Sequence, residues 1–161
     1  MIGAETAAFL EGGCAIIVGT VAADGEPRSN RGWALDVLRD GADDAGIEVR
    51  LLLEAGDPVL RENVETTGHI AITAGNVQTL HSTQLKGRIL TVEDATDADR
   101  ERAQRYVDAF ASDVVAVDRT PRELIVRMTP PEFFAITVAV SELYDQTPGP
   151  GAGARLERTA P

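Results

Sequence analysis

The sequence predicts a mainly β fold in which one antiparallel sheet closes into a small barrel capped by helices. Apolar and β-branched runs recur along the 161 residues and are joined by turn signals. The regular alternation of strand and helix that builds a parallel sheet is absent from this pattern. A hydrophobic share of 43% suffices for one ordinary core, and the length suits a single domain.

The first 38 residues predict a short helix followed by a hairpin. Residues 4–11 carry apolar positions at helical spacing and end at a glycine pair. The apolar stretch 14–22 predicts a strand, and Asp24-Gly25 supplies the tight turn that a hairpin needs. The returning strand, about 28–38, begins polar and becomes apolar. Its apolar residues alternate and should share one face: Trp33, Leu35 and Val37.

The middle of the chain predicts two further strands around a connecting helix. Residues 39–46 are acidic and contain glycine, which is typical of a loop, and 47–54 predicts a strand. Asp57 is a good N-cap and Pro58 suits the first helical position, so a short helix follows. The apolar stretch 69–75 predicts the fourth strand.

The last part predicts a long strand, the clearest helix and a closing pair of β-type runs. The strand spans about 79–92, where Gly87 marks a bulge, and the helix spans 96–112. Two β-type runs, 123–129 and 133–140, are separated by a proline pair. We therefore expect a domain over 1–146 and a Gly/Pro-rich tail over 147–161.

The charge balance narrows the classes of partner. Fifteen basic residues face 26 acidic ones, a formal net charge of -11, which argues against nucleic acid as a partner. Fourteen of the basic residues are arginine, so Lys86 is the only lysine.

Cysteine usage and the absence of long apolar runs suggest the compartment. Cys14 is alone, so it can form no intramolecular disulfide, and a reducing compartment is expected. No basic leader opens the sequence, and no apolar run approaches the roughly 18 residues of a membrane span. We expect a cytoplasmic protein that does not bind membranes.

Recognisable catalytic motifs are scarce. The serine-nucleophile, dinucleotide-binding and phosphate-loop signatures are missing, so no catalytic residue is assigned. His69 and His81 are too far apart in sequence to form a metal motif and have no supporting cysteines, so no metal site is predicted.

Two segments rich in hydrogen-bond donors contrast with the acidic background. Each alone is also typical of a solvated strand face. Together, in a chain of net charge -11, they favour a positive site for an anionic cofactor. The first segment, 27–35, contributes Arg28, Ser29, Asn30, Arg31 and Trp33. The second, 79–88, contributes Ser82, Gln84 and Lys86.

The ordered set of motifs is similar to a known family. The segments RSNRGWAL, HIAITAGN, TLHSTQLKGR and VSELYDQTPGPGAG, with the helix 96–112, resemble the pyridoxamine 5'-phosphate oxidase-like flavoproteins over residues 4–150. The resemblance implies a six-stranded antiparallel split barrel. It also implies a homodimer that holds FMN in two symmetric interface grooves and acts as an oxidoreductase on a small molecule.

The resemblance also implies roles for individual residues. Arg31 matches the arginine that opens the phosphate-binding strand, and Gln84 matches a glutamine that reaches the isoalloxazine ring. Trp33 either stacks near the ring or fills the core. Neighbouring positions would complete the phosphate and ribityl contacts: Arg28, Ser29, Asn30 and Lys86.

Two departures from the family pattern leave the substrate undefined. Asp36 stands where pyridoxamine phosphate oxidases carry a basic residue, and the C-terminal substrate segment has no convincing match. Two alternatives to an FMN oxidoreductase therefore stay open. One is a flavin- or haem-binding sensor without turnover, in which His69 or His81 would ligate the iron. The other is a reductase that uses the deazaflavin F420.

Overall fold

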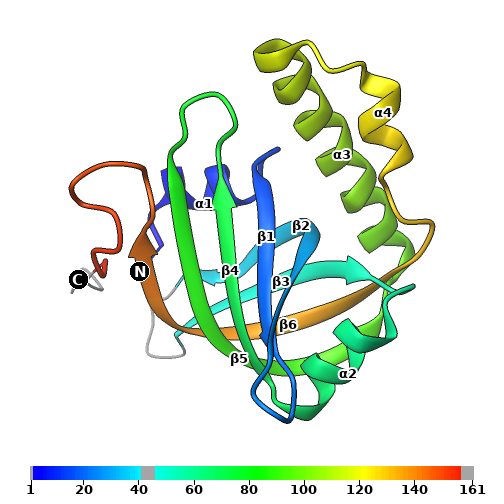
Figure 1. The fold of residues 1–161 in the computed structure, drawn as a ribbon, viewed down its shortest axis with the longest axis vertical. Helices are drawn as coiled ribbons and strands as arrows, with labels where there is room; N and C mark the ends of the chain where they lie inside the picture. Colours follow the sequence, from blue (N-terminus) through cyan, green and yellow to red (C-terminus); the bar gives the residue numbers. More distant parts are fainter. Residues whose placement is uncertain (1, 41–45, 157–161) are drawn as a thin grey trace.

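The computed structural model describes residues 2–40 and 46–156. Six strands close into one antiparallel barrel in the order β1-β2-β3-β6-β5-β4 (Figure 1). They are β1 (Ala15–Val21), β2 (Pro27–Asp40), β3 (Ile47–Glu54), β4 (His69–Gly75), β5 (Ser82–Asp94) and β6 (Phe133–Asp145). The mainly β, six-stranded split-barrel fold expected from the sequence is therefore confirmed.

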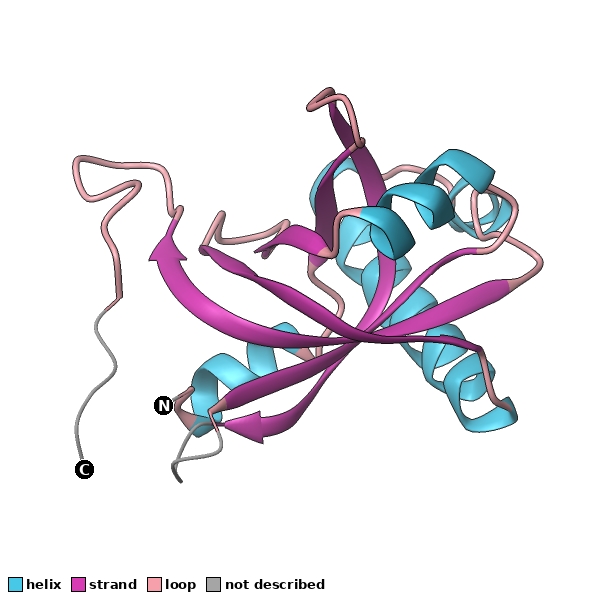
Figure 2. Cartoon of the chain, turned by 90° about the horizontal axis from the view of Figure 1, so that it is seen from below, coloured by secondary structure: helices cyan, strands magenta, loops and turns pink. Residues whose placement is uncertain are grey.

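Four helices surround the barrel: α1 (Ala4–Leu10), α2 (Pro58–Thr66), α3 (Asp97–Asp118) and α4 (Arg122–Arg127). Helix α2 begins as expected, because the Asp57 carboxylate accepts hydrogen bonds from the backbone N–H groups of Val59 and Leu60. Helices α3 and α4 lie side by side on one side of the barrel, and the chain beyond β6 leaves on the opposite side (Figures 1 and 2). The helices thus leave part of the outer barrel wall uncovered.

The core fills the inside of the barrel, because inward-facing residues of each strand alternate with outward-facing ones. Fully buried apolar side chains line it, among them Ile16, Val18, Leu35, Leu51, Ile72, Leu85 and Phe134. Tyr106 of α3 is also buried, and its hydroxyl donates a 2.9 Å hydrogen bond to the backbone oxygen of Cys14. Helix α3 is therefore part of the same core.

The expected strand over 123–129 is wrong, because Arg122–Arg127 form α4 and residues 128–129 form a turn after it. Ile125 and Val126 favour a strand by intrinsic propensity. The backbone N–H of Met128 instead bonds to the oxygen of Ile125 at 3.1 Å, and Ile125 is the one side chain that α4 buries. Packing of this single turn and a half along α3 overrides the local preference.

Three element boundaries differ from the expectation. Helix α3 continues six residues past 112 and ends where Arg119 adopts a left-handed conformation at φ 60°. Strand β5 starts at Ser82 because Leu80, at φ 62°, still belongs to the turn before it. A bulge in β2 between Gly32 and Leu35 interrupts the expected alternation, so Gly32–Leu35 are all buried and Val37 only half-buried.

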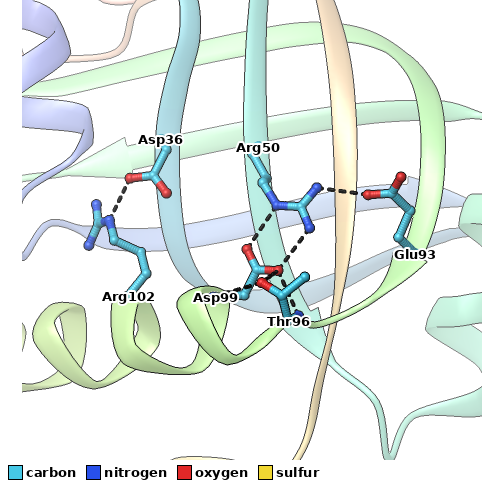
Figure 3. Close-up of polar contacts among 6 residues, drawn as sticks. All are labelled: Asp36, Arg50, Glu93, Thr96, Asp99 and Arg102. Atoms are coloured by element: carbon cyan, nitrogen blue, oxygen red, sulfur yellow. Dashed lines mark hydrogen bonds and ion pairs between the residues drawn. The ribbon is translucent and has the colours of Figure 1, made fainter.

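Ion pairs attach α3 to the barrel wall (Figure 3). Nε and one terminal nitrogen of Arg50 on β3 donate to the two carboxylate oxygens of Asp99, each at 2.8 Å. Arg102 of α3 donates to Asp36 on β2 at 2.5 Å. Asp36, which departs from the family pattern, therefore has a structural partner on α3.

The described part of the expected tail, 147–156, contains no helix or named strand but runs back along β6. The N–H of Gly153 bonds to the oxygen of Asp145 at 2.7 Å, and that of Leu156 bonds to the oxygen of Leu143 at 2.8 Å. The end of the expected tail, 157–161, and most of the expected acidic loop, 41–45, lie outside the described residues.

Candidate functional site

On the outer face of the barrel, cross-strand pairing places side chains of neighbouring strands next to one another in rows. Residues paired across antiparallel strands point to the same face. One row crosses β2, β1, β4, β5 and β6 through Ser29, Gly19, Ala71, Lys86 and Glu142. Beside it, Pro27 lies opposite Val21 and His69 opposite Arg88. These residues come from five strands, so only the pairing of the strands in the folded sheet brings them together.

An open groove of about 750 Å³ lies over these rows. Its floor is low because Gly19 and Ala71 are small, and a Cβ placed on Gly19 would lie 3.8 Å from the Cβ of Ala71. Among the eight residues expected at the cofactor site, Arg28, Ser29 and Lys86 line this groove. The volume is in the range of pockets that hold small molecules.

The groove is rich in cations. Arg28 forms a 3.0 Å ion pair with Asp57, whereas Lys86 and Arg88 pair with no carboxylate in the described part of the chain. Arg88 instead donates to Nε2 of His69 at 2.5 Å. The groove of this protein of net charge -11 therefore holds two positive side chains that form no ion pair in the described part of the chain, together with the carboxylate of Glu142.

Asp57 fixes the Arg28 side of the groove. The amide nitrogen of Asn30 also donates to Asp57, at 2.9 Å. Burial alone would raise the pKa of Asp57, but the hydrogen bond from the N–H of Leu60 and the charge of Arg28 together lower it. Asp57 therefore stays ionised and neutralises Arg28, which leaves Lys86 and Arg88 as the more available cations.

Gln84 and Ser82 lie on the same outer face as Lys86, nearer the start of β5. The amide nitrogen of Gln84 donates to the hydroxyl of Thr73 on β4 at 2.9 Å, which leaves the Gln84 carbonyl oxygen as an acceptor. The Ser82 hydroxyl donates to the backbone oxygen of Leu80 at 2.9 Å. These two residues border the groove without lining it.

Arg31 and Trp33 point elsewhere. The Arg31 guanidinium lies between the rings of Trp33 and Phe110, 4.8 and 4.2 Å from their centroids. Its Nε and one terminal nitrogen are buried without a hydrogen-bond partner. Trp33 is 5% exposed and sits near Phe133, with 6.4 Å between the ring centroids. The structure therefore does not bring Arg31 and Trp33 to the groove.

Arg88 and Glu142 line the groove but were not expected there, and His69, which also lines it, was expected only as an iron ligand in the haem alternative. Period-two alternation from Gln84 and Lys86 contained a signal for Arg88, because residues 84, 86 and 88 of one strand share a face. No comparable signal existed for Glu142, which reaches the groove only through the pairing of β5 with β6.

Neither a grouped metal site nor a membrane-spanning helix occurs among the described residues. Within 2–40 and 46–156, no three His, Cys, Asp or Glu side chains are grouped as a metal site. No helix in the same ranges is long and apolar enough to span a bilayer.

Comparison with known proteins adds relatives in fold. No protein-family model matches the sequence, and neither does any curated protein. HupZ from Group A Streptococcus is 19% identical, with 95% of this chain and 100% of that chain covered and a TM-score of 0.56. An F420 reductase is 17% identical, with 84% and 93% covered and a TM-score of 0.54.

A third structure extends the fold similarity to a flavin-binding protein. It is an FMN-binding protein from Syntrophomonas wolfei, 11% identical, with 89% of this chain and 78% of that chain covered and a TM-score of 0.50. At these identities the likeness concerns the fold.

Proposed function

Because the chain has the six-stranded split-barrel fold of the flavoproteins that its sequence resembles, we propose that it binds FMN in the outer groove and acts as a flavin-dependent oxidoreductase on a small molecule. The observation that carries the proposal is the groove itself. Lys86 and Arg88 of β5, without carboxylate partners in the described chain, stand along one side of a floor made of Gly19 and Ala71.

The residues present fit a flavin phosphate. Lys86 and Arg88 supply charge-assisted donors, and the Ser29 hydroxyl on the opposite wall supplies a neutral one. A flat ring system needs a floor without bulky side chains, and the small residues provide it. At the border of the groove, the amide nitrogen of Gln84 donates to Thr73, so its carbonyl oxygen would be an acceptor for a ring N–H that reaches this border.

The division of labour follows from these contacts. FMN, when bound, supplies the hydride chemistry, so a site with few acid and base residues is compatible with turnover. The chain's own residues anchor the phosphate, orient the ring and exclude water from one of its faces. The single cysteine supports the expectation that this happens in a reducing compartment such as the cytoplasm.

A homodimer belongs to the same proposal. Ile17 and Val21 on the outer face of β1 are 51% and 37% exposed, and Val21 lines the groove. A second copy packed on this face would bury both side chains and cover the open groove.

A deazaflavin of the F420 type is the second candidate cofactor, and the fold similarity to an F420 reductase favours it. The haem alternative has weaker support. Nε2 of His69 already accepts a hydrogen bond from Arg88, and Nδ1 of His81 lies 3.2 Å from the hydroxyl of Thr147. The contact of His69 involves the nitrogen that iron ligation would commonly use, whereas the contact of His81 leaves its Nε2 for a ligand.

Titration of the purified chain with FMN and with F420, followed by absorbance and fluorescence, tests the proposal. We expect Lys86→Ala to weaken binding by about ten- to a hundredfold, because one charge-assisted bond contributes roughly 1.5 to 3 kcal/mol. Gly19→Val should abolish binding by filling the floor. Arg105→Ala, an exposed position on α3, is the control.

The outcomes separate the possibilities. Equal affinities of Lys86→Ala, Gly19→Val and Arg105→Ala would overturn the proposal. Arg31→Ala tests the role implied by family resemblance, and a loss as large as that of Lys86→Ala would show that the guanidinium turns toward the cofactor. A preference for F420 over FMN would select the second candidate.

A further inference from the structure

Lys86 and Glu142 are cross-strand neighbours in the wall of the groove, but they form no ion pair. They are direct partners in the antiparallel pairing of β5 with β6, and both line the groove. Opposite charges at such positions are close enough to interact and normally stabilise a sheet. In the described part of the chain, however, Lys86 makes no ion pair, and neither does Glu142.

Tyr144 contacts both of these residues. Its hydroxyl donates a short hydrogen bond to the Glu142 carboxylate, and the Lys86 Nζ lies 4.7 Å from the centroid of its ring. The hydrogen bond to Glu142 raises the pKa of Tyr144, so the phenol keeps its proton and stays a donor. One tyrosine thus occupies the carboxylate with its hydroxyl and the ammonium group with its ring.

We propose that Tyr144 is a positioning residue that holds Glu142 away from Lys86 and so keeps the lysine available to an anion in the groove. The competing arrangement is a Lys86–Glu142 ion pair, which would place a carboxylate where a ligand phosphate has to bind. The inference rests on the proposed function in one respect, namely that the anion in the groove is a phosphate.

The neighbouring contacts leave Tyr144 as the side chain that decides between the two arrangements. The Ser141 hydroxyl donates to the backbone oxygen of Lys86 at 3.3 Å and does not restrain its ammonium group. Arg155 pairs with Tyr144 through a backbone bridge and forms no ion pair with Glu142 in the described chain. Arg88, the other free cation, is directed to His69.

Binding of inorganic phosphate and of FMN to four proteins tests the inference: wild type, Tyr144→Phe, Glu142→Gln and the double variant. Tyr144→Phe keeps the ring and removes only the hydroxyl. We expect it to weaken binding about three- to tenfold, since a half-exposed ion pair must then be broken to admit the ligand. Glu142→Gln should bind at least as tightly as wild type, and the double variant should match Glu142→Gln.

Rescue in the double variant separates a positioning role from a structural one. If Tyr144→Phe binds like wild type, or if Glu142→Gln fails to restore binding to the double variant, the inference is overturned. If wild type binds neither phosphate nor FMN, the proposed function fails. The NMR measurement on Lys86 described next needs no ligand and still tests the inference.

The single lysine permits a measurement without any ligand. Reductive methylation with ¹³C-formaldehyde labels Lys86 and the terminal amine, and Lys86→Arg identifies the lysine signal by its loss. In wild type, the Tyr144 ring current should shift this signal upfield. Tyr144→Phe should reduce the shift, because Lys86 moves toward Glu142, and the double variant should restore it. An unchanged shift in Tyr144→Phe would contradict the inference.

Discussion

At the scale of single residues, two glycines that line the groove differ in how much space a side chain would have. Gly19 lies on the groove floor, where an added Cβ would make only ordinary contacts. Gly87 lies at the bulge between β5 and β6, and an added Cβ there would fall 2.1 Å from the backbone oxygen of Ala139. The close approach of the two strands at Gly87 therefore depends on the missing side chain.

We expect Gly87→Ala to lower the free energy of unfolding by about 1 to 3 kcal/mol, because the methyl group forces the two strands apart. Gly19→Ala, at the other glycine that lines the groove, is the control and should change the stability by less than about 0.5 kcal/mol. Denaturant unfolding of both variants measures the difference. Equal stability of the two would mean that the bulge relaxes to admit a side chain.

Also at this scale, Arg31 shows the limit of assigning a role by position. Its backbone is level with the groove strands, since it pairs with Ile17 on β1. Its guanidinium lies instead between two aromatic rings, one of them on α3. A strand residue's role depends on where its long side chain packs, which pairing alone does not specify.

At the scale of elements, hydrogen bonds and an ion pair hold the N-terminal turn of α3 in place. Asp99 accepts from the Thr96 N–H and hydroxyl at 2.8 Å each, while the Asp99 N–H donates back to the Thr96 hydroxyl at 3.2 Å. Arg50, which also donates to Glu93 at 2.9 Å, binds the same carboxylate (Figure 3). One carboxylate thus caps the helix and attaches it to the barrel.

Asp99→Asn should lower the free energy of unfolding by roughly 2 to 3 kcal/mol at neutral pH, because Arg50 loses its doubly bonded partner and keeps only the exposed carboxylate of Glu93. The hydrogen bonds from Arg50 hold the pKa of Asp99 well below its ordinary value of 3.8, despite burial, which acts to raise it. This carboxylate therefore stabilises the fold fully above 3.8, and the stabilisation is lost as the pH falls toward the lowered pKa.

The measurement is urea unfolding of wild type and Asp99→Asn between pH 7 and pH 2. The difference between the two proteins should stay constant down to about pH 4 and shrink below it. Asp97→Asn, which removes an exposed carboxylate from the same helical turn, should cost much less. If the difference in unfolding free energy does not depend on pH, the negative charge of Asp99 does not contribute to stability.

At the scale of the whole molecule, the open groove and the exposed apolar residues of β1 lie on one wall of the barrel. Helices α3 and α4 lie against another part of the barrel, and the chain after β6 leaves on the side away from them (Figures 1 and 2). Ile17 and Val21 are therefore the exposed apolar residues beside the groove that a second copy would cover.

We expect sedimentation at micromolar concentration to show a dimer, and Ile17→Asp to shift it toward monomer with weaker FMN binding. Burying two charges in the proposed interface has a large desolvation cost. Val117→Asp, at an equally exposed apolar position on α3, is the control and should remain dimeric. A monomeric wild type would rule out the dimer, and dissociation by Val117→Asp alone would move the interface to the helices.

Local signals were enough to predict much of this architecture from the sequence. The β-branched runs of the barrel strands, the Asp57-Pro58 helix start and the glycine bulge at Gly87 were all readable, and the structure confirms each of them. They could be read because each depends on backbone preferences and hydrogen bonds that span only a few residues. Lys86 was conspicuous as the only lysine in an acidic chain.

Other features were decided by contacts between distant parts of the chain. Most of the expected strand 123–129 became helix α4 because α3 offered a surface to pack against, and Asp36 pairs with Arg102 of α3. Closure of the barrel set β1 beside β4, which put Gly19 next to Ala71 and made the groove floor. Local sequence patterns could not predict these features. The stabilising contacts join residues that are far apart in the sequence, and the sequence alone does not show which of them meet in the folded chain.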